Sequence, residues 1–446
     1  MTLSSPAIVT PPAPWRQAAT PTGSEPWLAN PESNLALGTT EPDMGRHLGE
    51  LAHDAEWHWP HKPVYFISDI HADAGALLES LEMVGLIERT GPRLRDFAVT
   101  QRGHEAAVIV GGDCLDKGPS NLKLLNTLRR LAQRGLGLQL LAGNHDLRLA
   151  LGLAHFSGPT DTRTEHLFLR MGSKTMPLLH EIWQRRLANK PETLSAVPSK
   201  KECRQRLLPR PEWPEHFKRV MANKLSEAAM DREIQRILEK RETFKSAYKT
   251  LGMGLRQVYA AAQEAHRMFI KPSGKYAWFL PNLKLVAREG SFLFAHAGLD
   301  DDTAGRLAGG GTEALNQAFQ REFKEDPFAC YAGPLGNTLR TKYRPVDYPL
   351  TDIGSQALRE AGIYAVVHGH RSNQQGQRLA LRSRVLHIEC DITLDRNTRR
   401  LQGMADRGAG ITVIRPEGCV WGISSDHPRV KLFDPLRAVR PERSNP

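Results

Sequence analysis

Two residue types that commonly bind metal ions stand two positions apart at the end of an apolar segment. The segment covers residues 64–71 and ends in Asp69, a spacer and His71. In an extended chain, residues i and i+2 point to the same side of the backbone, so both side chains can reach one point. A carboxylate oxygen and an imidazole nitrogen directed at one point are typical ligands of a divalent metal ion. Taken alone, the pair is also compatible with the start of a solvent-exposed loop.

Two further segments repeat this arrangement. Residues 108–110 are apolar and precede Gly-Gly-Asp-Cys-Leu-Asp-Lys-Gly at 111–118, and residues 138–141 precede Ala-Gly-Asn-His-Asp at 142–146. Glycine stands where a backbone has to turn tightly or approach a ligand closely. The side chains expected at the ends of the three apolar segments are Asp69, His71, Asp113, Asn144 and His145. Together, the three segments predict a metal site.

The elements that would position these side chains are buried strands joined by helices. A continuous apolar segment rich in β-branched and aromatic residues, such as 64–71, is typical of a strand buried on both faces. Leucines at a helical spacing follow in 74–84, and again in 119–135, where Pro119 begins the helix and Gly135 ends it. Strands that alternate with helices predict a parallel sheet, which binds ligands beyond the carboxyl ends of its strands.

Histidines also follow predicted strands in the second half of the chain. Residues 283–288 and 291–295 are expected to form a hairpin, and the second of these strands ends at His296. A strand over 363–367 is followed by His-Gly-His-Arg at 368–371. Further strands are expected near 385–389, 410–414 and 419–424. These strands would complete a second sheet.

The three motifs resemble the pattern of the metallophosphoesterase, or calcineurin-like phosphoesterase, superfamily. That pattern is D-x-H, then G-D-x-x-D-[RK]-G, then G-N-H-[DE], and the chain carries all of it in this order. The resemblance covers about residues 62–150 and 284–395 and is closest to bacterial-type phosphoprotein phosphatases. It implies an α/β fold, a four-layer α/β/β/α metallophosphoesterase sandwich with two mixed sheets, here with an inserted helical subdomain.

The resemblance also implies a role for each motif residue. Asp69 and His71 would bind a first metal ion, Asp113 would bridge two metal ions, and Asn144, His296 and His370 would complete the second site. His145 would be the general acid toward the leaving group, oriented by Asp116. His368 lies two residues before His370 and is an alternative ligand. The implied cofactors are two divalent metal ions, with Mn²⁺ expected and Fe or Zn as alternatives.

Cations for phosphate binding are expected at three positions. Lys117 stands where protein phosphatases usually carry Arg, and it can bind a phosphate as a point charge. Arg371 and Arg340 are candidates for a second clamp, and each is also compatible with an ordinary surface cation. Two departures from the pattern point in opposite directions. Asp146 in place of Glu favours general phosphoesterases, whereas Ser372 in place of a second His favours the phosphoprotein phosphatase branch.

Composition and charge divide the chain into parts. The predicted parts are a disordered leader (1–50), the first half of the phosphoesterase core (51–151), a basic helical insertion (152–282), the second half of the core (283–433) and a basic tail (434–446). Residues 184–250 hold 17 Lys or Arg and 9 Asp or Glu, so this segment carries a net +8 of the formal +11 of the chain. Such a balance favours anionic partners.

Length and residue types exclude several classes of protein. A chain of 446 residues with 40% hydrophobic content can bury a sizeable core. We find no segment with the roughly 18 consecutive apolar residues of a membrane span and no secretory signal in Met1–Pro14, so we expect a cytoplasmic protein without a membrane partner. The 5 cysteines lack C-x-x-C spacing, which argues against a disulfide framework or a zinc knuckle.

The combined prediction is a two-metal-dependent phosphoesterase that hydrolyses phosphomonoesters by attack of a metal-bridging hydroxide. Phosphorylated Ser or Thr of proteins is the favoured substrate, and a phosphorylated small molecule is a further candidate. The alternatives are a phosphodiesterase or nuclease and a diadenosine-polyphosphate hydrolase. In a phosphodiesterase or nuclease the basic insertion would bind nucleic acid, whereas an ordinary solvated helical face is the competing interpretation of its charge.

Overall fold

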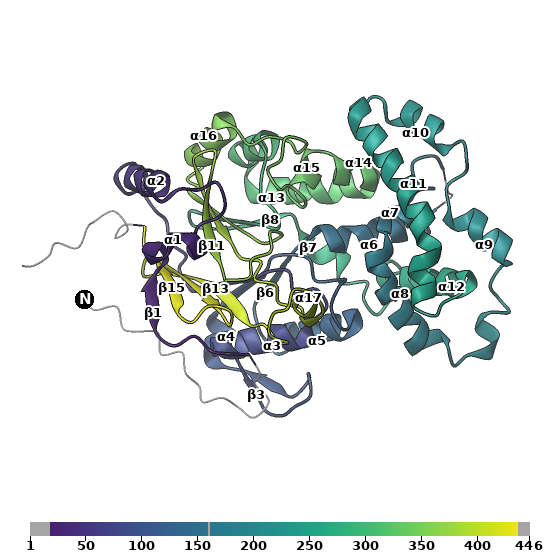
Figure 1. Cartoon of the computed structure of the whole chain (residues 1–446), viewed down its shortest axis with the longest axis horizontal. Coiled ribbons are helices and arrows are strands. Elements are labelled where there is room, and N and C mark those ends of the chain that lie inside the picture. Colours follow the sequence, from purple (N-terminus) through teal and green to yellow (C-terminus); the bar gives the residue numbers. More distant parts are fainter. Residues whose placement is uncertain (1–17, 159–160, 436–446) are drawn as a thin grey trace, which may run out of the picture.

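The computed structural model describes residues 18–158 and 161–435, and two β-sheets form its centre (Figure 1). In this part of the chain the larger sheet has eight strands in the order β1-β15-β14-β13-β2-β5-β6-β7. Its strands are β1 (Ser24–Pro26), β15 (Val430–Phe433), β14 (Cys419–Ser424), β13 (Gly410–Arg415), β2 (Val64–Ile67), β5 (Ala107–Val110), β6 (Leu138–Leu141) and β7 (Leu283–Lys284). Strands β2, β5 and β6 are parallel, with α3 (Ala74–Met83) and α5 (Asn121–Gln133) in the connections. The predicted β-α-β arrangement is therefore confirmed.

The smaller sheet has five strands in the order β11-β12-β10-β9-β8. Its strands are β11 (Arg378–Arg382), β12 (Val385–Glu389), β10 (Ala365–His368), β9 (Phe292–Ala295) and β8 (Val286–Glu289). Strands β8 and β9 form the predicted hairpin, and β10 lies parallel to β9 and β12. Both strands that precede the expected histidines, β9 and β10, therefore lie side by side at the centre of this sheet.

Apolar side chains of the two sheets meet in a shared core. The rings of Phe66 and Phe294 lie 5.6 Å apart between their centroids, and Ile109 and Val367 belong to the same buried cluster. Helices α3 and α5 lie outside the larger sheet, and α13 (Asp301–Glu325) and α16 (Asp352–Glu360) lie outside the smaller one (Figure 1). The structure thus confirms the α/β fold with four layers in the order α/β/β/α.

Two expectations are wrong, one about the sheet that two strands join and one about the disorder of the leader. Strands β13 and β14 do not join the smaller sheet, because β13 pairs antiparallel with β2 in the larger one. Residues 410–414 are all buried, so their apolar pattern does not indicate which sheet they enter. Residues 18–50 of the predicted disordered leader are also ordered, since β1 pairs with β15 and Trp27 is 1% exposed against Phe433. A few large apolar side chains suffice to anchor this segment. Residues 1–17 of the leader lie outside the described residues.

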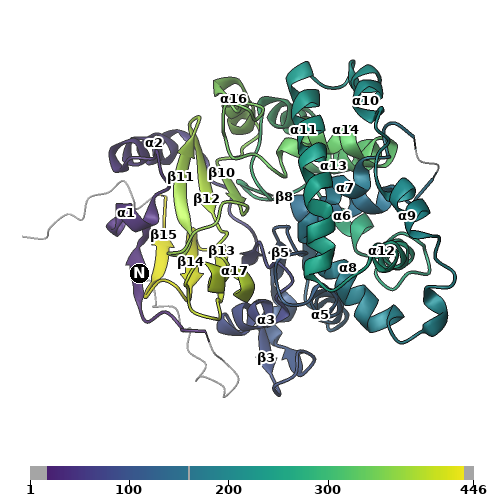
Figure 2. The same ribbon diagram turned by 45° about the vertical axis from the view of Figure 1, so that its right-hand side comes forward.

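A group of helices occupies the chain between α6 (Asn144–Ala154) and β7, to one side of the sheets (Figure 1). Its main helices are α7 (Leu167–Met171), α8 (Met176–Ile182), α9 (Lys200–Leu207), α10 (Trp213–Met221), α11 (Glu227–Thr250) and α12 (Leu255–Phe269), and its short turns are η2 (Ser173–Thr175), η3 (Trp183–Leu187), η4 (Pro191–Thr193) and η5 (Leu280–Asn282). Figure 2 shows the long helix α11 near α14 (Pro327–Ala332), which follows α13. The inserted helices are therefore placed beside the region where the two sheets end.

Short elements complete the described chain. They are η1 (Trp27–Ala29), α1 (Pro31–Asn34), α2 (Glu41–Asp54), β3 (Ile87–Arg89), β4 (Phe97–Val99), α4 (Gln101–Glu105), α15 (Pro334–Asn337) and α17 (Arg396–Leu401). The predicted tail of 434–446 lies outside the described residues from position 436 onward. None of the described helices combines the length and the hydropathy that a membrane span requires.

Candidate metal centre and active site

The ends of five strands from both sheets bring the predicted ligands together. Two groups of side chains each offer ligand atoms within 4.8 Å of one another. One group is His71, Asp113 and His145, and the other is Asp113, His296 and His370. Asp69 lies beside the first group, 3.7 Å from Oδ1 to His71 Nε2, and Asn144 Oδ1 lies 3.3 Å from His296 Nε2. All six predicted ligands therefore surround one place in the fold.

The Asp113 carboxylate lies between the two groups. Its Oδ2 is 3.7 Å from His71 Nε2, and its Oδ1 is 3.5 Å from His296 Nε2. The backbone N–H of His145 donates to Oδ1 at 2.8 Å. Burial alone would raise the pKa of Asp113, but the charges of His296, His145, His71 and Lys117 outweigh it and hold that pKa well below its usual range. The carboxylate is therefore ionised and able to bridge two cations.

The histidine rings are oriented for metal binding. His71 Nδ1 donates to the carbonyl of Leu115 at 3.0 Å, and His296 Nδ1 donates to the carbonyl of Gly111 at 2.8 Å. Each ring therefore presents the lone pair of Nε2 to the centre, as metal-binding histidines do. The Nε2 atom of His370 is buried without a hydrogen-bond partner among the described residues. These donors fit divalent metal ions.

The backbone around the ligands is tightly constrained. Asp69, His71, Asp113 and His370 all have positive φ, between 44° and 64°. Non-glycine residues rarely adopt this conformation, and it concentrates where function requires a special geometry. Gly143 lies so close to this loop that a Cβ would meet the backbone nitrogen of Asp113 at 2.0 Å. The sharp turns after the strands thus aim the ligands and require glycine beside them.

Asp146 holds the loop that carries Asp113, a role that the sequence did not reveal. Its Oδ2 accepts the backbone N–H groups of Gly143 at 3.1 Å and Cys114 at 3.3 Å, and its Oδ1 accepts that of Leu115 at 3.1 Å. Burial, followed by the charge of Asp113, raises the pKa of Asp146 to about 8. The departure from Glu at this position therefore concerns loop geometry.

His145 and Asp116 form the predicted pair. His145 Nδ1 donates to Asp116 Oδ2 at 3.0 Å, and the Thr175 hydroxyl donates to the same oxygen at 3.3 Å. On the other side of the ring, Arg148 Nη1 donates to Nε2 at 3.1 Å. Burial raises the pKa of Asp116 to about 7 and lowers that of His145. The hydrogen bond to Asp116 therefore fixes the orientation of the His145 ring.

A comparison with protein families identifies this arrangement. Residues 62–201 match the family described as calcineurin-like phosphoesterase. This segment, in the first half of the chain, holds the first three motifs of the site and is similar to that family. The match supports the enzyme class that the motifs predicted, a hydrolase that acts on phosphoric esters. No curated protein sequence matches the chain.

Several solved phosphatase structures resemble this chain at low identity. A cold-active protein tyrosine phosphatase shares 14% identity with a TM-score of 0.45, and the match covers 85% of this chain and 80% of that one. The cold-active protein-tyrosine phosphatase of a psychrophilic Shewanella species shares 13% identity with a TM-score of 0.40, and the match covers 84% of this chain and 80% of that one. A protein serine/threonine phosphatase from Saccharomyces cerevisiae shares 12% identity with a TM-score of 0.35, and the match covers 87% of each chain.

The predicted phosphate-binding cations lie in different surroundings. Lys117 Nζ lies 2.6 Å from His71 Nε2, so its ammonium group donates a hydrogen bond to the lone pair of that nitrogen. Arg340 lines the cleft above the metal centre, but its guanidinium donates to carbonyl oxygens of Tyr331 and Ala332. Arg371 is not among the residues that line the cleft.

The reason for the position of Arg371 is a buried carboxylate. Glu389 is 0% exposed and lies 3.4 Å from Arg371, 2.9 Å from Arg378 and 2.9 Å from Arg382. A buried charge has to be neutralised, and these guanidinium groups do so. His368 is also turned to this side, where its ring packs against His387, and it belongs to neither ligand group.

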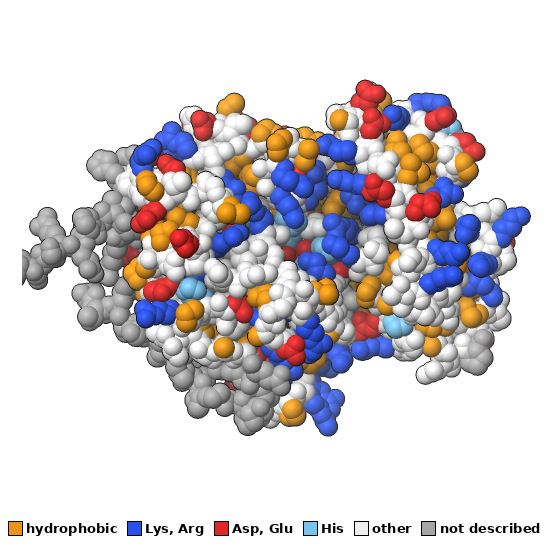
Figure 3. All heavy atoms as spheres, in the orientation of Figure 1, with side chains coloured by type: hydrophobic (Ala, Val, Ile, Leu, Met, Phe, Trp, Pro, Cys, Tyr) orange, Lys and Arg blue, Asp and Glu red, His pale blue; other side chains and the backbone are white. Residues whose placement is uncertain are grey.

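The metal centre lies at the base of a cleft of 780 Å³ between the sheets and the inserted helices. Figure 3 shows Lys and Arg side chains gathered around the hollow between these two parts. Basic residues that the sequence prediction missed include Arg148, Arg170, Lys174, Arg232, Arg236 and Lys240. Arg148 stands three residues after His145 on α6. This helical spacing places the two side chains on one face, and it could have indicated from the sequence that Arg148 lies near His145.

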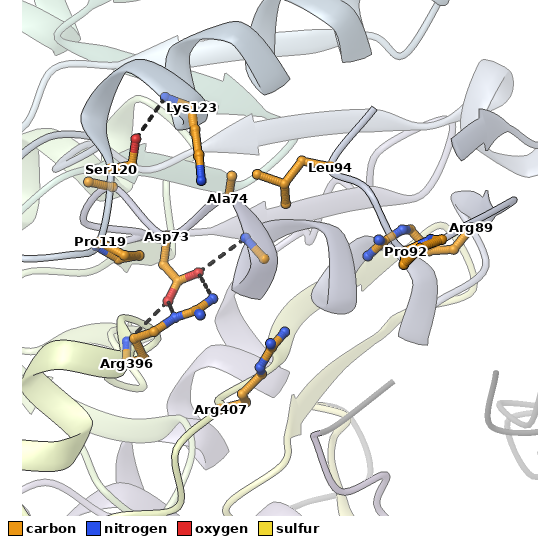
Figure 4. Close-up of a pocket in the computed structure, with 12 residues that line it drawn as sticks. Asp73, Ala74, Arg89, Pro92, Leu94, Pro119, Ser120, Lys123, Arg396 and Arg407 are labelled. Atoms are coloured by element: carbon orange, nitrogen blue, oxygen red, sulfur yellow. Dashed lines mark hydrogen bonds and ion pairs between the residues drawn. The ribbon is translucent and has the colours of Figure 1, made fainter. Parts of the chain in front are cut away.

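A second cavity of 520 Å³ lies beside the loop that carries His71 (Figure 4). Asp73 at this cavity accepts two backbone N–H groups of the first turn of α3 and therefore caps that helix. Figure 4 shows Asp73 pointing toward Arg396, whose Nε donates to it at 2.8 Å. Because these polar groups satisfy one another, we interpret the cavity as part of the support for the loop with Asp69 and His71.

Proposed function

We propose that this chain hydrolyses phosphomonoesters with two divalent metal ions at the centre described above. The observation that carries the proposal is the single Asp113 carboxylate placed between two imidazole groups, 3.7 Å from His71 Nε2 and 3.5 Å from His296 Nε2. A bridging carboxylate with nitrogen and oxygen donors on both sides is the donor set that a two-metal phosphoryl-transfer site requires.

We propose ligands for each metal ion from the donor set, which also limits the choice of metal. Asp69 and His71 would hold the first ion, and Asn144, His296 and His370 the second, with Asp113 shared. Nitrogen and oxygen donors without thiolate suit Mn²⁺, Fe or Zn²⁺, and we propose Mn²⁺. Bound metal ions polarise phosphoryl oxygens, lower the pKa of water and neutralise charge that develops during phosphoryl transfer. Burial raises the pKa of the nearby Cys114 thiol well above its usual range, which keeps this thiol out of the donor set.

The residues of this chain would supply the proton and part of the phosphate binding. His145 is buried and held by Asp116, so its ring has one orientation. Protonated at Nε2, His145 would donate that proton to the oxygen of the leaving group, and Asp116 would stabilise the ring. Arg148 and Lys117 flank the two rings and are proposed to bind oxygens of the phosphoryl group.

Within this reaction class we propose phosphorylated Ser or Thr of proteins as the substrate. The support is the resemblance of the motifs to phosphoprotein phosphatases and a cleft of 780 Å³, which is far larger than a phosphate group. A specific observation also favours the alternative of a phosphodiesterase or nuclease. Basic residues of α11 face the cleft, where a polynucleotide backbone could lie. A hydrolase of diadenosine polyphosphates would use the same cations.

The deciding experiment compares the hydrolysis of p-nitrophenyl phosphate and bis-p-nitrophenyl phosphate by Mn²⁺-loaded protein. The Asp113→Asn protein is the blank, because it keeps the shape of the side chain and removes the bridging charge. We expect a higher kcat/KM for the monoester. A preference for the diester would contradict the phosphomonoesterase proposal and favour the polynucleotide alternative.

A further inference from the structure

One face of α11 forms a wall of the cleft. The residues of this helix that line the cleft are Ala229, Arg232, Glu233, Arg236 and Lys240. Apart from the adjacent Arg232 and Glu233, they recur at intervals of three and four positions, which is the spacing of one helical face. Arg232, Arg236 and Lys240 therefore form a row of cations that lines the cleft with the metal centre.

Three of the cations that line the cleft have no counter-ion within ion-pair distance among the described residues. In the described part of the chain, no hydrogen bond or ion pair engages the side-chain nitrogens of Lys174, Arg232 or Lys342. The acidic residue on the same face, Glu233, lies 2.6 Å from Arg170 and is already paired. Unpaired cations from three separate elements thus face one space.

Burial and neighbouring cations lower the pKa of two lysines that line the cleft. Burial, followed by the charge of Arg170, lowers the pKa of Lys240 to about 7, although Glu233 opposes the shift. Desolvation, followed by Arg148 and Lys117, also lowers the pKa of Lys174. Cations that destabilise one another in this way are stabilised when an anion enters the cleft.

The form of the wall indicates which anion fits. A single phosphate is typically bound by a bidentate Arg or by several backbone N–H groups at one point. Here the free cations stand on η2, on α11 and on the loop after α15, as separate point charges. The mouth of the cleft also carries apolar surface, with Val346 56% and Tyr348 40% exposed. Separated charges with apolar contacts between them fit an acidic polypeptide better than a compact polyphosphate.

We propose that the cleft selects phosphorylated polypeptide segments in which acidic residues flank the phosphorylated side chain. Lys174, Arg232 and Lys342 would contact the flanking carboxylates while the phosphoryl group lies at the metal centre. This proposal rests on the proposed phosphomonoesterase function and adds a substrate preference to it. The specificity would then come from the insertion and the loop around Lys342, outside the metal-binding motifs.

The test uses two phosphoserine peptides of equal length, one with Glu and one with Gln at the flanking positions, and p-nitrophenyl phosphate as a general substrate. For the Mn²⁺-loaded full-length protein we expect kcat/KM to be about tenfold higher for the Glu peptide at low ionic strength, since each exposed ion pair contributes up to about fivefold. The ratio should shrink as salt is added, because exposed charges are screened.

A matched pair of variants locates the effect. Arg232→Gln should lower the ratio of the two kcat/KM values about threefold. Arg241→Gln is the control, because Arg241 lies nine positions further along α11, half a turn away from Arg232, and does not line the cleft. Circular dichroism of both variants should show unchanged helix content, as both substitutions keep a good helix former.

The outcomes separate the two proposals. If the metal-loaded protein hydrolyses neither of the two peptides nor p-nitrophenyl phosphate, the phosphomonoesterase function itself is overturned. Hydrolysis of p-nitrophenyl phosphate with equal kcat/KM for both peptides, or an equal change in Arg232→Gln and Arg241→Gln, would overturn the acidic preference alone. Faster turnover of inorganic tripolyphosphate than of the Glu peptide would also overturn it and assign the cations to a compact polyphosphate.

Discussion

Gly369 offers a sharp test of the metal centre, because its replacement by Ala would push directly on a predicted ligand. A Cβ at this position would lie 2.0 Å from Ser68 Oγ and 2.1 Å from Asp69 Oδ2. A hydrogen bond joins these two atoms, since Ser68 Oγ donates to Asp69 Oδ2 at 2.6 Å. The backbone N–H of His370 donates to the same carboxylate oxygen at 2.8 Å. The substitution would therefore disturb the donors that orient Asp69.

The size of the effect follows from these distances. Ordinary van der Waals contact begins at 3.4 Å, so both contacts are too short by more than about 1 Å. A metal ligand has to lie within about 0.2 Å of its ideal distance, so a displacement of this size removes Asp69 as a ligand. Losing the groups that orient a ligand lowers metal affinity by about 10- to 100-fold, and we expect the upper end of this range for Gly369→Ala. Overpacking should also lower the free energy of unfolding by about 1–3 kcal/mol.

The assay is calorimetric titration of the metal-free protein with Mn²⁺, combined with urea unfolding of the same samples. Gly309→Ala is the control, because a Cβ there has no atom within 4 Å and Gly309 lies in α13, far along the chain from the motifs. That variant should bind Mn²⁺ like the wild type and be at least as stable, since Ala favours a helix by about 0.5–1 kcal/mol over Gly. Unchanged Mn²⁺ affinity and turnover in Gly369→Ala would refute the assignment of Asp69.

Three further predictions concern single side chains. Asp113→Asn should lose both metal ions and all turnover, which elemental analysis of the purified protein and a phosphatase assay would measure. His145→Asn should keep the metal content of the wild type while kcat falls by about 10²- to 10⁴-fold; loss of metal in this variant would show that His145 is a ligand in the group that it forms with His71 and Asp113. Burial lowers the pKa of Lys431 in the folded state to about 7, below about 10.4 in the unfolded chain. Between these values the unfolded state binds more protons, so this residue should make the free energy of unfolding rise from pH 7 to pH 10, and Lys431→Met should reduce that slope in urea titrations.

The metal centre could be predicted because its information is local. Each ligand follows a short apolar strand, and a strand that is buried on both faces can be read from its residue types. His296 and His370 lie far along the chain from Asp69, yet each also follows such a strand. The family pattern then assigned them to one site, and the structure brings them together.

The residues that the sequence misplaced depend on distant contacts. Arg371 is adjacent to His370, but it turns toward Glu389, whose burial comes from the pairing of β12 with β10 and β11. The charge of the insertion was visible as a net value, whereas the row of Arg232 and Lys240 over the cleft follows from the packing of α11. Net charge has no direction until the fold supplies one.

The backbone of the site also decides which substitutions give interpretable results. The described chain has eleven non-glycine residues with positive φ, and six of them are Asp69, His71, Asp113, Asp116, Lys117 and His370. Among residues with a side chain, Asn and Asp adopt this conformation most readily, because their short polar groups can bond to the nearby backbone. Asp113→Asn therefore changes the charge at φ 52° and adds little backbone strain. An Ala at the same position would change both at once, so a loss of metal in Asp113→Asn reports on the bridging charge, whereas the same loss in Asp113→Ala would not distinguish charge from strain.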